Sequence, residues 1–427
     1  MILENQKRSK HHIVLLDLYD AGHHRSYLEI LCRYWIDSGF QGQLTVVTTN
    51  HFARVHEDFC NWIQSESENG LVLHLLDLDV NGLSGWKGLL KANSAHKKAM
   101  LESIKLNPDH IVCMFFDHCQ RAIATAKIPS IQQKRQVSSV PGDGPTPYPD
   151  KITISGIYFR ASFHYPILTW KNRVQNWRKW VILKSALSNM ALTKLFCLDP
   201  DAPQFINDRT NRNIALSLPD GTVFYEANES PSTMRARLKI ADSDQIVLLI
   251  GSLDERKGVY QAITAFSNLT ETLRATTVLV LAGKSAPEHT DQLRTAVEAG
   301  RQFGKIVWID EYISNEGISS LLDACDIVLV PYQYHIGSSG ILIRAAAALK
   351  PVIGSDFGMV GRVIEREKLG VTVNSESAKS ITGALTSALQ CDIPNHSQTS
   401  SKSFAQQNEA SRFAKAIFEP MQEADPA

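Results

Sequence analysis

Three apolar runs in the second half of the chain each lead into a loop whose residues could bind phosphate. The runs cover residues 246–251, 278–283 and 326–331. Continuous Ile/Val/Leu runs are typical of parallel strands that are buried on both faces. Loops after such strands lie at the carboxyl edge of the sheet, where open α/β sheets bind their ligands. Arg256 and Lys257 follow the first run, and we predict that this basic pair neutralises a phosphate group. A solvated pair at a helix start is the alternative.

The third run is followed by a short loop of glycines and serines and then by a helical pattern. The loop residues are Gly337, Ser338, Ser339 and Gly340. Backbone N–H groups and two hydroxyls at a helix N-terminus can hold a phosphate or a sugar hydroxyl. Arg344 could reach a carboxylate or phosphate from the first turns of the same helix.

Two polar sites follow strands in the first half. Gly22, His23 and His24 come after the apolar run 12–18, where a glycine permits close backbone approach and either histidine can donate to a phosphate or sugar oxygen. A helix entry with surface histidines would give the same pattern. Asp117 and His118 end the run 110–116 and could orient a hydroxyl or bind a sugar. A hydrogen-bonded pair at a strand end is the alternative there.

The elements that must position these residues alternate between strand and helix. Strands are predicted at 12–18, 44–49, 71–78, 110–116 and 152–159, and again at 246–251, 278–283, 305–310, 326–331, 350–355 and 370–373. This alternation indicates doubly wound parallel sheets. A Pro/Gly turn at 218–221 separates the halves, so we expect domains at 1–217 and 218–395. Residues 396–427 are predicted to be a linker and a helix that packs back on the first domain.

Composition excludes several classes of protein. Lys+Arg and Asp+Glu are both 44, which argues against a nucleic-acid binder. The seven cysteines include no C-x-x-C pair, which predicts reduced thiols in a cytoplasmic protein and no zinc site. The N-terminus lacks the apolar segment of a signal peptide, and no apolar run is long enough to span a membrane. Asp77 and Asp79 resemble a metal-binding D-x-D but end an apolar strand, so no metal is expected.

One segment departs from the neutral average. From Lys151 to Leu198 there is no acidic residue, while Trp170, Trp177 and Trp180 are interleaved with basic residues. A basic helix with aromatic residues suits an anionic membrane surface, so peripheral membrane contact through 170–184 is one interpretation. The other is that the tryptophans pack inward and the basic residues line a cleft for an acidic substrate.

The second half resembles the family-4 (group 1) glycosyltransferases of the GT-B fold. The resemblance is carried by GSLDERKG (251–258), VLAGKS (280–285), DACDIVLVPY (323–332) and AAAALKPVIGSDFGMVG (345–361). It implies an α/β protein of two Rossmann-like, doubly wound domains that face each other across a cleft. It also implies retaining, metal-independent transfer of a hexosyl group from a nucleotide-sugar, with no further cofactor, to an acceptor such as a glycan, a lipid-linked sugar or a small molecule.

The resemblance assigns roles to the candidate residues. Arg256 and Lys257 would stabilise the leaving diphosphate, the Gly22–His24 loop would close over it, and Asp117 and His118 would address the sugar or acceptor.

The family's two glutamates, its E-x7-E motif, are missing. Counted back from Pro351, they would fall at Ile336 and Arg344. We expect the loop 337–340 and Arg344 to replace them. This loss gives one alternative, a GT-B binding or scaffold protein without activity. A second alternative is another GT-B chemistry, such as that of a sugar-nucleotide epimerase.

Overall fold

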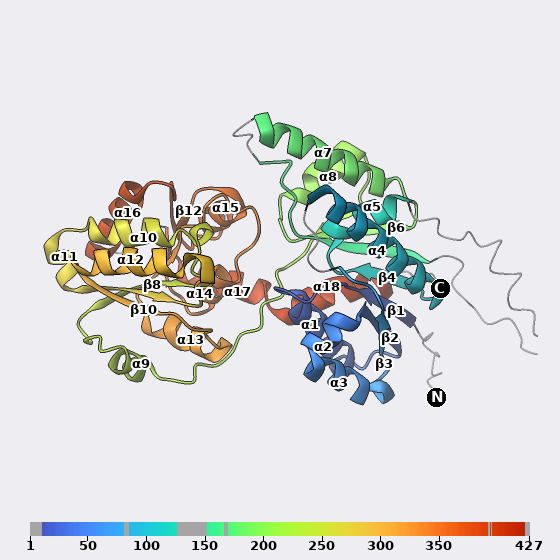
Figure 1. Cartoon of the computed structure of the whole chain (residues 1–427), viewed down its shortest axis with the longest axis horizontal. Helices are drawn as coiled ribbons and strands as arrows, with labels where there is room; N and C mark the ends of the chain where they lie inside the picture. The colour runs from blue at the N-terminus through green and yellow to red at the C-terminus, as the bar shows by residue number, and fades with distance from the viewer. Residues whose placement is uncertain are drawn as a thin grey trace, which may run out of the picture. The chain divides into compact units, whose positions relative to one another are not determined.

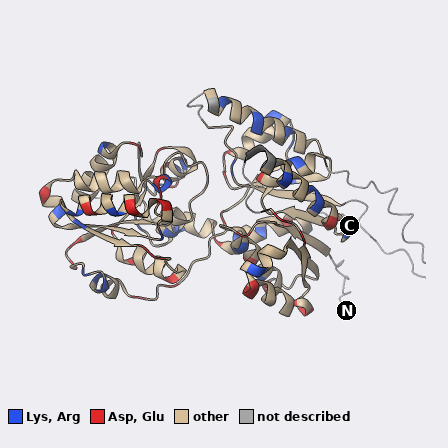
Figure 2. Ribbon diagram, in the orientation of Figure 1, with Lys and Arg blue, Asp and Glu red and all other residues tan. Residues whose placement is uncertain are grey.

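The computed structural model describes residues 11–80, 85–125, 152–165, 170–391, 393 and 395–422. The chain forms two compact units (Figure 1). The N-unit comprises Met1–Gly221 and Phe413–Ala427, and the C-unit comprises Thr222–Arg412. We predicted a linker and a helix at 396–427, and the division between the units falls inside this range, so that residues 396–412 belong to the C-unit. Acidic and basic residues are spread over both units (Figure 2).

The N-unit is built on a parallel sheet. Among the described residues it has seven strands in the order β3-β2-β1-β4-β5-β6-β7. Their bounds are β1 His11–Leu16, β2 Gly42–Thr49, β3 Leu71–Leu76, β4 His110–Cys113, β5 Thr153–Tyr158, β6 Leu192–Cys197 and β7 Ala215–Ser217. The first five strands were predicted. The last two were missed because β6 carries Thr and Lys at its second and third positions and β7 is only three residues long.

Helices connect these strands. They are α1 His24–Asp37, α2 Asn50–Val55, α3 Glu57–Ser65, α4 Gly85–Lys105, α5 Phe116–Thr125, α7 Trp170–Leu187 and α8 Ala202–Thr210, with a 3-10 turn, η1, at Ser67–Asn69. The chain runs from β1 outward to β2 and β3 and then returns to β4 on the other side of β1. The loops after β1 and β4 are therefore adjacent at the point where the strand order reverses, which is where such sheets bind ligands.

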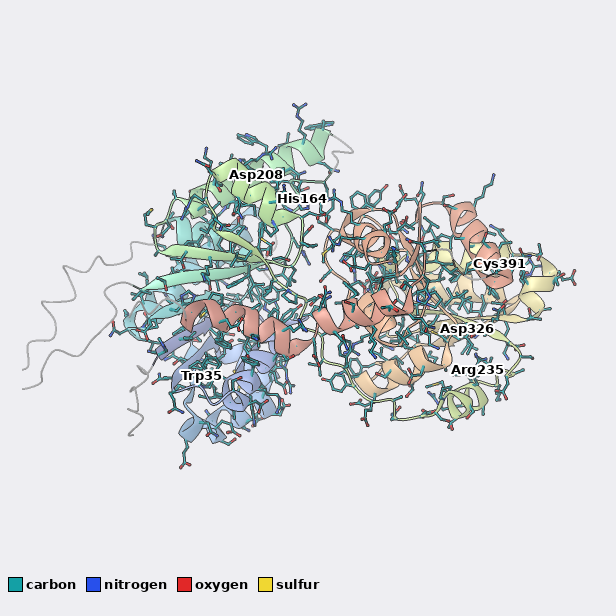
Figure 3. The ribbon with its side chains drawn as sticks, turned by 180° about the vertical axis from the view of Figure 1, so that it is seen from behind. Trp35, His164, Asp208, Arg235, Asp326 and Cys391 are labelled. Carbon is teal, nitrogen blue, oxygen red and sulfur yellow. The ribbon has the colours of Figure 1, made fainter. Side chains whose placement is uncertain are left out.

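Helix α18 (Ala410–Gln422) contributes aromatic side chains to the N-unit core. The ring of Phe413 stacks on Tyr27 at 4.9 Å, and Phe418 lies 5.8 Å from the indole of Trp35, which is 1% exposed (Figure 3). These contacts bury large apolar surfaces, so the last helix is part of the N-unit core.

The C-unit has the same architecture with a second parallel sheet. Its described strands follow the order β10-β9-β8-β11-β12-β13. They are β8 Gln245–Ile250, β9 Thr277–Ala282, β10 Lys305–Ile309, β11 Ile327–Val330, β12 Val352–Ser355 and β13 Gly370–Val373. These agree with the predicted strands to within two residues at each end. Every residue of β9 is buried, as expected for a strand covered on both faces. The strand order reverses between β8 and β11, which brings together the loops after these two strands.

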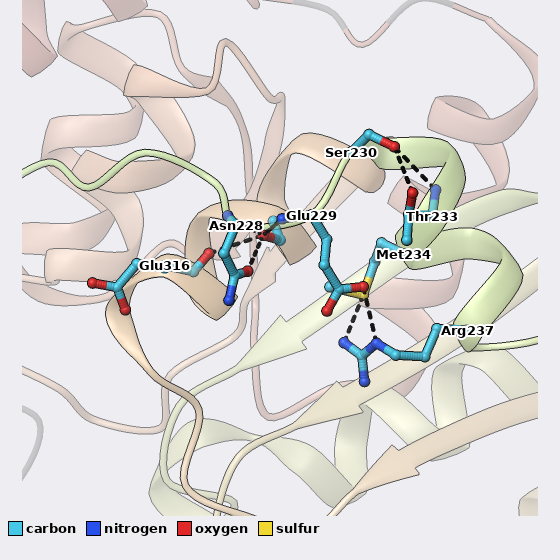
Figure 4. Close-up of polar contacts among 8 residues, drawn as sticks. Asn228, Glu229, Ser230, Thr233, Met234, Arg237 and Glu316 are labelled. Atoms are coloured by element: carbon cyan, nitrogen blue, oxygen red, sulfur yellow. Dashed lines mark hydrogen bonds and ion pairs between the residues drawn. The ribbon is translucent and has the colours of Figure 1, made fainter.

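The helices of the C-unit complete the doubly wound pattern. They are α9 Pro231–Arg237, α10 Val259–Ser267, α11 Glu271–Ala275, α12 Thr290–Arg301, α13 Asn315–Ala324, α14 Gly340–Ala347, α15 Gly358–Arg366, α16 Ala378–Gln390 and α17 Gln398–Gln407, with 3-10 turns η2 Glu255–Lys257 and η3 Pro287–His289. Figure 4 shows the hydrogen bonds that hold the segment before α9 against α13. The hydroxyl of Ser320 in α13 accepts the N–H groups of Asn228 and Glu229, each at 3.1 Å, and Glu229 pairs with Arg237 at 3.0 Å.

Candidate functional site

Lys257 lies at the strand-order reversal of the C-unit. Its Nζ is 3.8 Å from the centre of the Tyr332 ring, in the loop after β11. A Cβ added to Gly251, in the loop after β8, would lie 3.6 Å from the same Nζ. The ammonium group thus sits over the ends of the two central strands, held against an aromatic face by a cation–π contact. The positive charge of Lys257 therefore lies at the carboxyl edge of the sheet, in the loop where the basic pair was predicted.

Arg256 was predicted to act together with Lys257, but the structure gives it different contacts. Its guanidinium is half-exposed and lies 3.5 Å from the carboxylate of Asp254. Its backbone carbonyl accepts the N–H of Gln333 at 2.8 Å, which ties the loop after β8 to the loop after β11. The contribution of Arg256 that the structure records is therefore a backbone link between the two loops.

The glycine–serine loop at 337–340 leads directly into α14. The hydroxyl of Ser339 caps this helix by accepting the N–H of Leu342 at 3.2 Å, and it lies 3.1 Å from the Tyr332 hydroxyl. An added Cβ at Gly340 would meet no atom within 4 Å, and Gly337 and Ser338 are half-buried. Tyr332 therefore connects Lys257 to the N-terminus of α14, where backbone N–H groups and the helix dipole favour an anion.

The loop after β12 lies against this one. Gly358 has φ +72°, and a Cβ there would lie 2.2 Å from the carbonyl oxygen of His335. Only glycine fits so close to another backbone in this conformation. The loops after β8, β11 and β12 thus form one polar cluster at the carboxyl edge of the sheet.

Arg344 makes different contacts from those expected. Its Nη2 lies 2.7 Å from the side-chain oxygen of Asn315 at the start of α13, and its guanidinium is 5.6 Å from the Tyr225 ring centre. Burial lowers the pKa of Arg344. Its Nη1 is buried and has no hydrogen-bond partner among the described residues. Arg344 also lines a cavity of about 380 Å³ with Phe224, Tyr225, Glu226, Ala227, Ser319, Leu322, Asp323, Ala347 and Ala348.

In the N-unit, the structure separates the two neighbouring histidines. His24 is buried, its Nδ1 lies 2.7 and 2.8 Å from the two carboxylate oxygens of Asp17, and its ring stacks on Phe115 at 3.5 Å. His23 is exposed at the start of α1, after Gly22, which has φ +74° and open space around it. His23 is thus free to meet a ligand, while His24 is held inside by Asp17.

Asp117 and His118 lie in the first turn of α5 rather than at the end of β4, which stops at Cys113. The Asp117 carboxylate accepts the N–H groups of Phe159 at 2.8 Å and Arg160 at 3.1 Å, just beyond β5. Burial raises the pKa of Asp117 although these two hydrogen bonds oppose the shift. Asp117 therefore fixes the chain after β5, and this is the contact that the structure records for it.

His118 belongs to a cluster of rings around Tyr19. Its ring centre is 4.7 Å from that of Tyr19, with the two rings tilted, and 6.3 Å from that of His96, with these two rings stacked. His118 is an exposed residue, but partial burial of its imidazole lowers the pKa of His118 to about 4, and the nearby histidines add to this shift. The ring is therefore neutral at pH 7 and can accept a hydrogen bond or a proton.

Two members of this cluster escaped the sequence analysis. His96 comes from the middle of α4 and is 3% exposed, and burial lowers its pKa. Tyr19 follows β1, and burial raises its pKa to about 12. No spacing in the sequence links His96 to His118. By contrast, His164, which follows β5, is paired with buried Asp199 at 3.0 Å and is removed from the surface (Figure 3).

Comparison with known proteins finds a family likeness in the C-unit. Residues 231–407 match the family described as glycosyl transferases group 1. An uncharacterized glycosyltransferase of Methanocaldococcus jannaschii is 26% identical over 154 residues, which are 36% of this chain and 38% of that protein. Lipopolysaccharide glucosyltransferase WaaG of Escherichia coli is 27% identical over 135 residues, 32% of this chain and 34% of its own length. The chain thus matches little more than a third of these relatives.

Solved structures resemble the whole chain. HepE of Anabaena, determined in complex with UDP, has a TM-score of 0.62 at 13% identity and covers 96% of this chain and 100% of its own. Sucrose-phosphate synthase of Thermosynechococcus elongatus has a TM-score of 0.63 at 17% identity, with 96% and 97% covered. At these identities the likeness shows the fold. The chain has the two-domain α/β architecture of the GT-B fold, and residues 231–407 match the model of the group 1 glycosyl transferases.

Proposed function

We propose that the protein is a glycosyltransferase whose C-unit binds a nucleotide-sugar donor. The observation that carries the proposal is Lys257, whose ammonium group lies between the ends of β8 and β11 inside the matched group 1 domain. When the bond between the anomeric carbon and the diphosphate oxygen breaks, negative charge develops on the diphosphate. The acceptor oxygen forms the new bond and loses its proton. Positive charge and helix N-termini at the diphosphate lower the barrier without a metal ion.

The proposal assigns the diphosphate to Lys257 and to the N-terminus of α14. Ser339 keeps that helix capped, and the open space at Gly340 leaves room for a ligand at its backbone N–H groups. For Arg256 to bind the diphosphate as well, its guanidinium would have to break its ion pair with Asp254. This exposed pair at 3.5 Å is weak enough to exchange for a phosphate.

Arg344 is also proposed to contact the donor, although its side chain does not lie as the sequence suggested. Its buried Nη1 lacks a partner among the described residues, and the aromatic ring of Tyr225 lies beside its guanidinium. An oxygen-rich part of the donor would satisfy that nitrogen. Arg344→Gln is expected to weaken donor binding and to leave the cap of α14 intact.

The N-unit would handle the acceptor. His118 is neutral at pH 7 because its pKa is about 4, and as an exposed residue it can accept a hydrogen bond from an acceptor hydroxyl. His23 is the second exposed candidate. Asp117 and His24 would act as positioning residues, since each is already held by protein groups.

A donor screen tests the proposal. UDP-sugars come first because HepE was solved with UDP and with UDP-glucose, and GDP- and ADP-sugars follow. Lys257→Met should lower affinity by about 10- to 100-fold, the usual loss for a charged hydrogen bond. Lys402→Met, an exposed lysine in α17, should leave affinity unchanged.

Turnover separates the proposal from its alternatives. A transferase releases nucleotide faster when an acceptor is present, whereas an epimerase converts the donor alone and a scaffold protein releases nothing. Neither alternative gains support from the comparisons, whose family and relatives are described as transferases. Failure of every donor to bind at millimolar concentration would overturn the proposal.

A further inference from the structure

Helix α7 exposes an apolar stripe that the N-unit core does not use. Trp170 is 73% exposed, Val174 47%, Trp177 64% and Val181 46%. Their spacing of four, three and four residues places all four side chains on one face of the helix. Exposing two tryptophan side chains to water on one face of a helix is unfavourable, and such exposed apolar patches usually mark an interaction surface.

The opposite face of α7 attaches the helix to the N-unit. The indole of Trp180 makes edge contacts with Phe163 at 5.4 Å and Phe205 at 5.8 Å, and Leu183 is fully buried. Lys179 donates to the Ser162 hydroxyl at 2.8 Å. The helix is therefore anchored without the stripe. The sequence left open whether the tryptophans face in or out, and the structure divides them: Trp180 packs inward, and Trp170 and Trp177 point outward.

Basic residues border the stripe. A period of 3.6 residues places Arg173 on one side of it and Arg178 on the other, with Lys184 one turn beyond Val181, and all three are exposed. Figure 2 shows basic residues along α7. No acidic residue occurs between Lys151 and Leu198, although the chain as a whole has equal numbers of acidic and basic residues. The positive charge is therefore local to this helix and its neighbours in sequence.

We propose that α7 docks the protein on an anionic lipid surface. Tryptophan side chains favour the membrane–water interface, and basic residues are attracted to anionic headgroups. A second copy of the chain fits this face less well, because two like-charged helices would meet. No helix among the described residues is long and apolar enough to cross a membrane, so the contact proposed is a surface contact.

Vesicle co-sedimentation of the full chain tests the inference. The wild type should bind phosphatidylcholine vesicles that contain 30 mol% phosphatidylglycerol, and should bind pure phosphatidylcholine weakly. Trp170→Ser/Trp177→Ser should reduce partitioning at least about tenfold. Replacing Arg173, Arg178 and Lys184 by Gln should reduce it about fivefold per charge, and 0.5 M salt should mimic that loss. Phe303→Ser/Tyr312→Ser, which removes exposed aromatic rings from the C-unit, is the matched control.

The outcomes are decisive because circular dichroism checks that each variant is folded. Loss of binding in both α7 variants with the control unchanged supports the inference. Equal binding by the wild type and the tryptophan variant, or no binding to the anionic vesicles, overturns it. A dimer in size-exclusion chromatography that dissociates in the tryptophan variant would instead show a second copy on this face and would also overturn it.

Discussion

Replacing Gly258 by Ala should destabilise the C-unit and disorder its ligand-binding edge. Gly258 precedes α10 with φ +72°, and an added Cβ would lie 2.2 Å from the carbonyl oxygen of Pro331 and 3.0 Å from the Gln333 side-chain nitrogen. The left-handed conformation costs a non-glycine residue about 1–2 kcal/mol. Relief of the backbone overlap should cost about 1–3 kcal/mol more, the usual penalty for overpacking.

The expected total is thus about 2–5 kcal/mol. For a unit of this size, each kcal/mol lowers the melting temperature by about 2–4 °C, so a drop of at least about 4 °C should be visible by scanning calorimetry. The relief must move the loop after β8 away from the loop after β11, so donor affinity should fall as well.

Gly383→Ala is the matched control for this change. Gly383 lies in α16 of the same unit, with no positive φ and no atom within 4 Å of an added Cβ. Alanine is the better helix former by about 0.5–1 kcal/mol, so this variant should melt at or slightly above the wild-type temperature. If Gly258→Ala melted within 1 °C of the control, the close approach of the two loops would be refuted.

Three further predictions test the burial and pairing of single residues. Burial lowers the pKa of His110 from 6.5 to about 3. As the pH falls below 6.5, this imidazole therefore takes up a proton in the unfolded chain but stays neutral in the native protein. The free energy of unfolding should therefore be about 2 kcal/mol smaller at pH 5 than above pH 6.5 because of this one site. Urea titrations at pH 7.5 and 5.0 should show a smaller loss in His110→Asn than in the wild type. Asp326 pairs with Arg235 at 3.1 Å and accepts a backbone N–H at the start of β8 (Figure 3), so Asp326→Ala should cost about 1–2 kcal/mol in urea unfolding. The exposed Asp242→Ala should cost nothing measurable, and equal midpoints would contradict the pairing. Cys391 is exposed and the other six cysteines are buried, so a thiol reagent should modify one group rapidly in the native protein and seven after denaturation; more than one rapid group would show that the buried thiols are accessible.

The sequence alone determined most of the architecture. Long apolar runs predicted every strand of the C-unit and five of the N-unit, because a strand buried on both faces needs apolar residues at every position. It also located the loops at the carboxyl edge, since a loop that follows a strand of a parallel sheet can lie nowhere else. Lys257, His23 and His118 were chosen as candidates in this way, and the structure leaves each of them partly or fully exposed.

Only the tertiary structure decided whether a given side chain points into the protein or toward solvent. His23 and His24 are adjacent in the chain, yet one is exposed and the other is held by Asp17 inside the N-unit. Arg344 was predicted to reach a carboxylate or phosphate, and the structure shows that its side chain donates a hydrogen bond to Asn315 on another helix.

His96 joins the ring cluster around Tyr19 from the middle of α4, and Trp180 packs inward on a helix whose other tryptophans are exposed. Helical spacing sorts side chains into faces, but it does not say which face meets the protein. That choice depends on the shapes and charges of elements distant in sequence, which come together only when the sheets and helices have packed.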